Sequence, residues 1–271
     1  MAAVKQEDSY VLGREVSGSI RLDAQHLLWR MHLGYLLHPD IPITKGMKIA
    51  ELGTGTGTWL FDASRNLPSD VVLHGYDISD SQFPARELWP KNITLGLLDS
   101  LNDPPAALTG RYDIVHLRMW ASNLKESNTM PLLQHIKLLL KPGGYLQWED
   151  ADLVHQAVRR EDAEAFERQM NAIFEMAGHK YDWVSELSDH LPQHSFEVLK
   201  TENNGFQHDL VQLCTNTYLM AILEILRGIN RNTGLSITEH EDALKALLQR
   251  SRSGLVYNWG AVTILASKIE D

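Results

Sequence analysis

The chain has 271 residues, of which 44% are hydrophobic, and it carries 25 basic against 35 acidic residues, a formal net charge of -10. A chain of this length and composition can bury a substantial core, either as one elaborated domain or as a domain with a cap. The acidic balance argues against a surface that follows the phosphates of a nucleic acid. We therefore expect no nucleic-acid partner.

The sequence carries no signal for a membrane or an oxidising compartment. Its first residues, MAAVKQEDSYVLGRE, lack the apolar core of a signal peptide, and no later apolar run reaches the roughly 18 residues of a membrane span. Cys214 is the single cysteine, and a small buried hydrophobic residue is its simplest interpretation. These features predict a soluble, cytoplasmic protein without a membrane partner.

The first half of the chain alternates between strands and helices. Asp23 can cap a first helix, which His38-Pro39 ends. Strands are predicted at residues 48–52, 71–76, 93–98, 112–117 and from 145 to 148, with helices at 58–67 and from 129 to 140. The Lys-Pro-Gly-Gly turn at 141–144 stops the second of these helices. Such alternation predicts a parallel sheet with right-handed crossovers.

The pattern changes after Asp150. Helices are predicted at 161–177, 210–227 and 239–250, and strands at 196–201 and 261–266. We expect the last strand to return to the sheet.

A glycine-rich run, KIAELGTGTGTW at residues 48–59, lies where a strand meets a helix. Gly53, Gly55 and Gly57 would let backbone N–H groups approach a ligand, and the helix N-terminus favours a negative group. In a dinucleotide fingerprint the third glycine comes one position later, and a phosphate-binding P-loop needs a lysine where Thr58 stands. The first alternative is weakened and the second is excluded.

The motif Glu51-x-Gly53-x-Gly55-x-Gly57 resembles the first motif of class I S-adenosylmethionine-dependent methyltransferases. Asp77 follows the second strand, at a distance that suits a carboxylate accepting hydrogen bonds from ribose hydroxyls. The resemblance places Ile78 against the purine face, and Asp99, with Ser100, opposite the adenine amino group. Glu51 would touch the ligand directly, act through water or position the loop. The resemblance implies S-adenosyl-L-methionine as the cofactor. It also implies a Rossmann-like, doubly wound α/β fold: a mostly parallel seven-stranded sheet with an antiparallel C-terminal strand and a helical cap.

Further segments are similar to fungal UMTA-type methyltransferases of secondary metabolism, a group that includes gliotoxin-pathway N-methyltransferases. The matching runs are YVLGR at 10–14, RLxxQH at 21–26, GYLLHP at 34–39, DIS at 77–79, QFP at 82–84, YDIVHLR at 112–118 and GGYLQWE at 143–149. They cover about the first 150 residues. Two departures are Thr58, where an aliphatic residue is common in that family, and the order Glu149-Asp150, where Asp-Glu is common.

The resemblance divides the chain into an N-terminal helical lid (1–46), a cofactor-binding core (47–160) and a remainder with an inserted substrate cap (161–271). Tyr10 and Arg21 would then close over the cofactor. The implied function is methyl transfer to a small, hydrophobic secondary metabolite through an oxygen, nitrogen or sulfur acceptor, with a homodimer left open. One alternative is a protein of this fold that catalyses a non-methylating rearrangement or acts as a regulator. Another, the nicotinamide oxidoreductase, is disfavoured by the early third glycine.

Ligands of open parallel sheets lie beyond the carboxyl ends of the strands. The residues expected there are Arg118, Met119, Trp120, Trp148, Glu149 and Asp150. Trp120 and Trp148 offer flat walls to a substrate, unless they pack in the core. Arg118 can bind the cofactor carboxylate or the substrate, or make a structural salt bridge. Glu149 and His116 are candidates for a general base, with a buried core histidine as the alternative for His116.

In-line methyl transfer requires no metal. His26, His32 and His38 are six residues apart, which places them on different faces of a helix rather than in a set of ligands. We therefore expect no metal site.

Overall fold

The computed structural model describes residues 11–125 and 127–270, so Tyr10 lies outside the described residues. The strands are β1 (Lys48–Leu52), β2 (Val72–Asp77), β3 (Ile93–Leu97), β4 (Tyr112–Arg118), β5 (Leu140–Arg159), β6 (Phe196–Gly205) and β7 (Val256–Lys268). The helices are α1 (Val16–Leu33), α2 (Thr58–Asn66), α3 (Met130–Leu139), α4 (Glu161–Met176), α5 (Leu187–His190), α6 (Val211–Thr233) and α7 (Thr238–Gln249).

The strands of the described residues form one seven-stranded sheet in the order β3-β2-β1-β4-β5-β7-β6. Neighbouring strands from β1 to β5 run parallel, and β7 is antiparallel to both β5 and β6. The predicted sheet, with its antiparallel C-terminal strand, is confirmed. Chain order reverses between β1 and β4, which is where ligands of doubly wound sheets bind.

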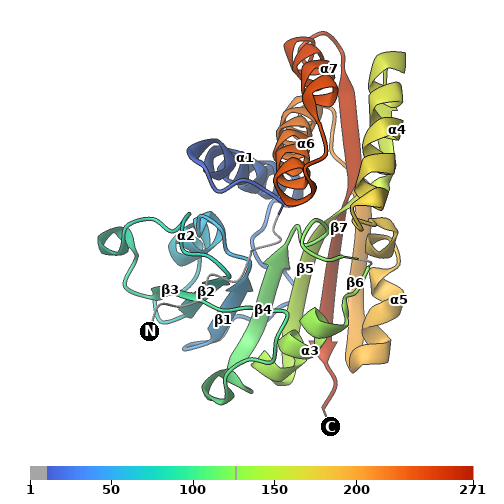
Figure 1. The fold of residues 1–271 in the computed structure, drawn as a ribbon. Coiled ribbons are helices and arrows are strands. Elements are labelled where there is room, and N and C mark those ends of the chain that lie inside the picture. The colour runs from blue at the N-terminus through green and yellow to red at the C-terminus, as the bar shows by residue number, and fades with distance from the viewer. Residues whose placement is uncertain (1–10, 126, 271) are drawn as a thin grey trace.

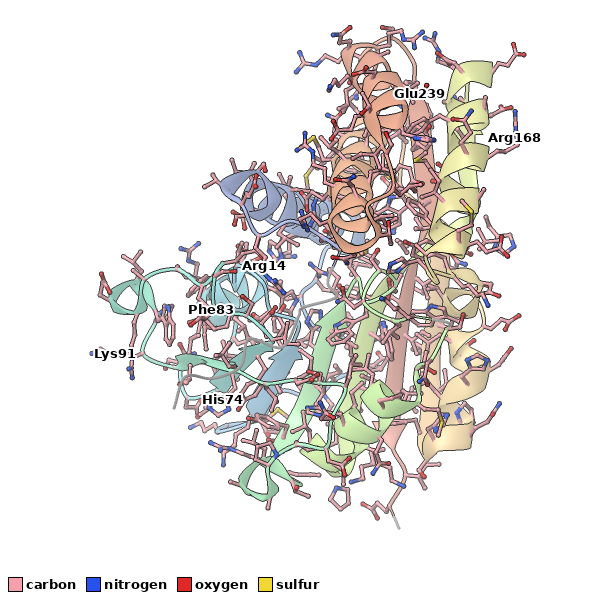
Figure 2. The ribbon with its side chains drawn as sticks, in the orientation of Figure 1. Arg14, His74, Phe83, Lys91, Arg168 and Glu239 are labelled. Atoms are coloured by element: carbon pink, nitrogen blue, oxygen red, sulfur yellow. The ribbon has the colours of Figure 1, made fainter. Side chains whose placement is uncertain are left out.

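The helices are unevenly distributed around this sheet (Figure 1). Helices α4, α6 and α7 lie alongside the far halves of β5 and β7, α2 lies near β2 and β3, and α1 lies between α2 and α6. Arg168 of α4 and Glu239 of α7 are exposed at the far end of this group, well away from Lys91 at the sheet edge (Figure 2). In the described part of the chain, no helix combines the length and hydropathy needed to cross a membrane.

Strand β5 is much longer than predicted. It begins at Leu140 rather than Tyr145 and runs for 20 residues to Arg159. Its far half pairs with β7 as far as Arg159 opposite Val256, with a register shift between Asp152 and Ala157. Pairing with β7 satisfies the backbone N–H and C=O groups of this far half. The local sequence pattern of β5 does not reveal a partner so distant in the chain. The same sheet therefore extends into the helical cap.

Helix α1 also departs from the prediction, because it begins at Val16 and not after Asp23. It ends at Leu33, where Gly34 adopts φ +75° and donates its N–H to the Arg30 carbonyl, before His38 is reached. Asp23, in mid-helix, accepts hydrogen bonds from the hydroxyls of Thr56 and Thr58. It therefore ties α1 to the glycine loop instead of capping a helix.

The segment before α1 runs against α6. A Cβ atom added to Gly228 of α6 would lie 1.9 Å from the Val11 carbonyl oxygen, so only glycine allows this approach. The Gly13 N–H donates to Glu224 of α6 at 3.2 Å. The segment before α1 is thus fixed to α6 of the cap.

Candidate active site

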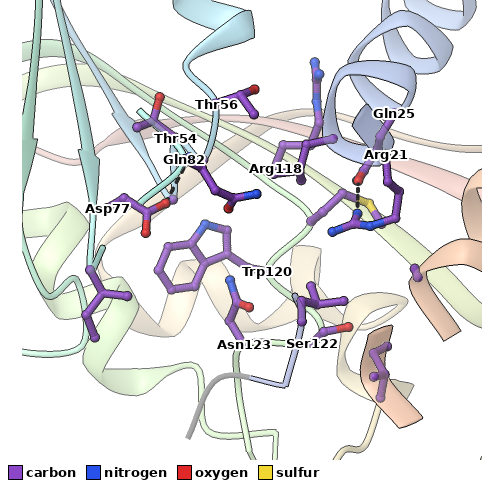
Figure 3. A pocket seen from close by; sticks show the side chains of 18 of the residues that line it. Arg21, Gln25, Thr54, Thr56, Asp77, Gln82, Arg118, Trp120, Ser122 and Asn123 are labelled. Carbon is purple, nitrogen blue, oxygen red and sulfur yellow. Dashed lines mark hydrogen bonds between the residues drawn. The ribbon is translucent and has the colours of Figure 1, made fainter. Parts of the chain in front are cut away.

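A cavity lies beyond the carboxyl ends of β1, β2 and β4, between the sheet, α1 and the cap. Nine residues with a predicted role in cofactor binding line it: Arg21, Glu51, Gly53, Gly55, Asp77, Ile78, Asp99, Ser100 and Arg118. Trp120 lines it too, whereas Gly57, His116, Trp148 and Glu149 do not. Figure 3 shows Asp77 and Trp120 across this space from Arg21 and Gln25 of α1.

The glycine loop bends in left-handed backbone conformations, with φ +69° at Gly53 and +54° at Gly55. A Cβ atom at Gly53 would lie 3.1 Å from Nε1 of Trp120, and one at Gly55 would lie 3.0 Å from Leu22 of α1. Both the conformation and the close packing therefore require glycine at these positions. They bring the loop backbone to the cavity wall.

Gly57 stabilises the glycine loop without lining the cavity. It also has a positive φ, +73°, at the start of α2, and its N–H donates to the Thr54 carbonyl at 2.8 Å. The early third glycine therefore shapes the turn into α2, and a cofactor contact from it stays a prediction.

Asp77, the last residue of β2, joins the loop to the second strand. Its Oδ2 accepts from the Gly55 N–H at 2.9 Å, and its Oδ1 accepts from the Ser79 N–H at 3.2 Å. Burial raises the pKa of this carboxyl, although these backbone bonds oppose the rise. A carboxylate offers about four acceptor sites, so each oxygen retains capacity toward the cavity.

The loop after β3 adds a second carboxylate and an apolar rim. Asp99 accepts hydrogen bonds from the Leu101 N–H and the Asn102 amide, which stabilises its own turn. Ile78 and Leu101 both line the cavity with exposed fractions of 55% and 40%. Large apolar side chains exposed at a cavity rim are typical of a surface that a flat apolar group covers.

Glu51, the last residue but one of β1, is only 5% exposed. It accepts a hydrogen bond from the Thr54 hydroxyl in the glycine loop. Glu51 therefore holds the loop and borders the cavity at once.

Arg118, at the end of β4, is held by a buried partner. Glu149 on β5 pairs with its guanidinium, and Glu149 also accepts from the Gln147 amide at 2.6 Å. Burial would raise the pKa of Glu149, but the charges of Arg118 and His116 outweigh it and lower the pKa to about 2. Arg118 in turn contacts His26 of α1 at 3.3 Å and lies over the Trp29 ring.

The proposed base Glu149 is fully buried behind Arg118, and His116 is also fully buried. The His116 nitrogens lie 3.7 Å from Glu51 and 3.6 Å from Glu149, and its ring stacks on Trp59 at 3.9 Å. These positions place both residues beneath the cavity floor. They favour positioning roles, and a catalytic role for either stays a prediction.

Arg21 borders the cavity from α1, but its charge is matched within the protein. Its Nε and Nη2 donate to Glu224 of α6 at 2.9 and 3.0 Å, and its Nη1 donates to Gln25 at 3.0 Å. Both side chains of this ion pair, Arg21 and Glu224, are buried. Arg21 therefore links α1 to the cap, and its contact with the cofactor stays a prediction.

The two tryptophans have different places. Trp120 forms part of the cavity wall, and its indole N–H donates to the Leu52 carbonyl at 3.1 Å. Trp148 is fully buried, stacks edge-on with Trp183 and donates to Asp150 at 3.0 Å. Trp148 thus packs in the core, the alternative given for it, whereas Trp120 is positioned to contact a ligand.

The cap supplies the other half of the cavity, and this half is largely aromatic and aliphatic. Its lining residues include Leu153, Phe174, His179, Tyr181, Tyr218, Ala221, Ile222, Ile225 and Trp259. From the sequence, this region is predicted only as a cap. One local signal was available: Glu167 falls on the buried face of α4 together with Ala163, Phe166 and Met170.

Within the described residues, no group of His, Cys, Asp and Glu side chains is arranged to hold a metal ion.

Comparison with known proteins agrees with this geometry. Residues 28–207 match the methyltransferase domain family. The chain is 34% identical to methyltransferase grgD of a Penicillium species over 161 residues, 56% of this chain and 56% of that protein. It is 30% identical to N-methyltransferase verN of Clonostachys rogersoniana over 140 residues, 51% of this chain and 49% of that protein. The chain thus spans about half the length of the curated relatives it matches.

A solved structure shares the fold. Phosphoethanolamine N-methyltransferase 2 of Haemonchus contortus, in complex with phosphomonomethylethanolamine and S-adenosylhomocysteine, superimposes with a TM-score of 0.54 at 16% identity. The superposition covers 94% of this chain and 57% of that one. The Rossmann-like fold of the prediction is confirmed, and because the family match covers more than half of the sequence, the chain belongs to the methyltransferase domain family.

Proposed function

We propose that the chain binds S-adenosyl-L-methionine at the glycine loop and transfers its methyl group to a small, hydrophobic acceptor beneath the cap. The observation that carries the proposal is the arrangement of Asp77. Its carboxylate is held by the loop backbone at 2.9 Å and keeps acceptor capacity toward the cavity. This is the geometry that a ribose diol needs from a carboxylate.

The surrounding residues fit the rest of such a cofactor. Ile78 and Leu101 provide an exposed apolar rim for a purine, with Asp99 and Ser100 beside them. Arg118, oriented by Glu149, is one of several cations in the cavity wall, and we assign the cofactor carboxylate to it. Trp120 presents an aromatic ring to a positively charged sulfur.

When bound, the cofactor supplies a methyl group activated by its sulfonium. The work of the chain is then to align the acceptor with that group and to exclude water. Phe174, Ile222 and Trp259 give the acceptor half an apolar wall, which supports a hydrophobic acceptor rather than a charged one. The relatives named as methyltransferases support the same reaction class.

We assign residues 1–46 to a lid, 47–160 to the cofactor-binding core, and 161–271 to the rest of the core with an inserted substrate cap, as the sequence predicts. The buried pair of Arg21 and Glu224 supports a lid connected to the cap. Cys214, buried and unpaired, supports a reducing, cytoplasmic setting. A homodimer stays an expectation that size-exclusion chromatography with light scattering tests.

Two measurements test the proposed function. Isothermal titration calorimetry should give saturable, stoichiometric binding of S-adenosylhomocysteine, and the absence of binding would contradict the proposal. Mass spectrometry of products from a panel of aromatic acceptors should show the gain of one methyl group in place of hydrogen. Isomerised products without that gain would instead favour a rearrangement.

A further inference from the structure

A buried carboxylate lies behind the acceptor half of the cavity. Both oxygens of Glu167 on α4 accept from the Tyr218 hydroxyl on α6, each at 2.8 Å. The Gln156 amide of β5 donates to Glu167 at 2.6 Å and to the Tyr218 oxygen at 3.2 Å. Glu167 is 7% exposed and Tyr218 is 5% exposed, and Tyr218 is the member of this cluster that lines the cavity.

The surroundings of Glu167 do not balance its charge. In the described part of the chain it forms no ion pair with a cation, unlike Glu149. Tyr181 and Tyr257 also face it, and the charges near those two tyrosines are further carboxylates, Asp150 and Asp162. Burial raises the pKa of Glu167 to about 7, against the hydrogen bonds from Tyr218 and Gln156.

Fold stability gives no reason to keep such a group. A buried carboxylate without a cation is costly, and an apolar side chain at this point on α4 would continue the buried face. A carboxyl that can change its protonation state, in contact with a cavity residue, is instead typical of catalytic sites.

We propose that Tyr218 and Glu167 form a proton relay that accepts the proton of the methyl acceptor. This inference rests on the proposed function. The lone pair of the acceptor's hydroxyl or amine forms the bond to the methyl carbon, and the electron pair of the broken carbon–sulfur bond stays on sulfur. The acceptor proton moves to the Tyr218 oxygen as the Tyr218 proton moves to Glu167, which releases it to water after product departure.

Two other groups are alternative candidates for the proton acceptor. Glu149 is enclosed by Arg118 and Gln147 and does not reach the cavity. His179 does line the cavity, is 4% exposed and has an unpartnered Nδ1 within the described structure, so it is the competing proton acceptor. Tyr257 is a matched control, because its ring lies 4.9 Å from that of Tyr218 but its hydroxyl donates to the Ala163 carbonyl.

The kinetic test compares two probes of the same shape, 2-naphthol and 2-naphthalenethiol, at mildly alkaline pH. The naphthol is largely neutral there and needs a base, whereas the thiol is already ionised. Tyr218→Phe and Glu167→Gln should each lower kcat for the naphthol about 100-fold with little change in KM, and kcat for the thiol less than about threefold. In the variants the naphthol rate should follow the ionisation of the naphthol itself. Tyr257→Phe should behave as wild type.

An infrared titration tests the relay without turnover. A protonated-carboxyl band should disappear from the wild-type protein as pH rises through about 7 and be missing in Glu167→Gln. Asp150, whose pKa burial raises to about 6, gives a second protonated-carboxyl band. Both proteins contain Asp150, so its band cancels when the Glu167→Gln spectrum is subtracted from the wild-type spectrum. Tyr218→Phe should shift the Glu167 band.

Three results would overturn the relay: no difference between wild type and Glu167→Gln in the infrared titration, equal losses with naphthol and thiol, or a large naphthol loss confined to His179→Gln. If wild type methylates neither probe, the infrared titration decides, since presence of the band supports the relay and its absence refutes it. Failure of the proposed function is separate, because it appears as the absence of S-adenosylhomocysteine binding to the wild-type protein.

Discussion

The sheet end and the cap each bury a glutamate beside the same cavity, but they treat its charge differently. Glu149 on β5 is compensated by Arg118 and has its pKa lowered to about 2. Glu167 on α4 has only hydrogen bonds from Tyr218 and Gln156, and its pKa is raised to about 7. Of these two glutamates, the one at the sheet end therefore holds a fixed charge, while the one in the cap has a charge that can change.

The largest expected effect comes from breaking the compensated pair. Glu149→Gln leaves Arg118 buried against a neutral amide, so we expect a loss of about 3–5 kcal/mol in the free energy of unfolding, measured by urea denaturation. Glu167→Gln, the matched change in the cap, should be neutral or stabilising at about pH 8. Equal losses in the two variants would remove the distinction between the regions.

The pH dependence of stability sharpens the same contrast. Because the folded-state pKa of Glu149 is below its ordinary 4.5, its contribution is present above about pH 4.5 and is lost as pH falls toward about 2. The folded-state pKa of Glu167 is above 4.5, so its contribution is present at low pH and is lost as pH rises toward about 7.

Wild type should therefore lose about 3 kcal/mol relative to Glu167→Gln between about pH 4.5 and pH 8. Urea denaturation across that range measures this, and parallel curves for the two proteins would show that Glu167 does not titrate there.

A smaller effect is expected from the ribose carboxylate. Asp77→Asn keeps the size of the side chain but removes a charged acceptor, so the dissociation constant for S-adenosylhomocysteine should rise about 10- to 100-fold by calorimetry. Asp113→Asn is the control, because Asp113 contacts Lys48 and Lys141 away from the cavity. An unchanged dissociation constant in Asp77→Asn would place the ligand elsewhere.

The smallest effect separates backbone strain from site geometry. Gly53 and Gly46 have nearly equal φ angles, +69° and +70°, but a Cβ atom meets Trp120 only at Gly53. Alanine at either position should cost about 1–2 kcal/mol of stability. Only Gly53→Ala should also weaken S-adenosylhomocysteine binding, by about tenfold, and an equal loss of affinity in Gly46→Ala would attribute the effect to strain alone.

The sheet end and the cap also differ in how much could be predicted from the sequence. The glycine loop and Asp77 were predictable because their roles depend on turns and strand ends within 30 residues of one another. The enclosure of Glu149 was not, since Arg118 and Gln147 reach it only through the pairing of β4 with β5. Trp148 was ambiguous for the same reason, because alternation along a strand does not say which face carries the cavity.

The cap was the least predictable part. Tyr218 and Glu167 are 51 residues apart and meet only because α4 and α6 pack on the far half of β5 and β7. Their apolar periodicity predicts two helices, and the buried charges of Glu167 on α4 and Glu224 on α6 distinguish them from ordinary core helices. The start of α1 was missed because its first turn is exposed, with Val16 at 76% and Ile20 at 63%, and it shows no apolar stripe.

The 20-residue length of β5 has a mechanical consequence. Strand β5 carries Glu149 beside the sheet end and, within the register shift between Asp152 and Ala157, Gln156 beside the Tyr218 hydroxyl, so one stretch of backbone connects the two ends of the cavity. Because β5 and β7 pair on both sides of this shift, we expect the cap to move with the sheet rather than as a separate body. Changes in acceptor choice are therefore expected through repacking of side chains on α6, which leaves the frame around the methyl donor undisturbed and makes that helix face the natural target for redesign.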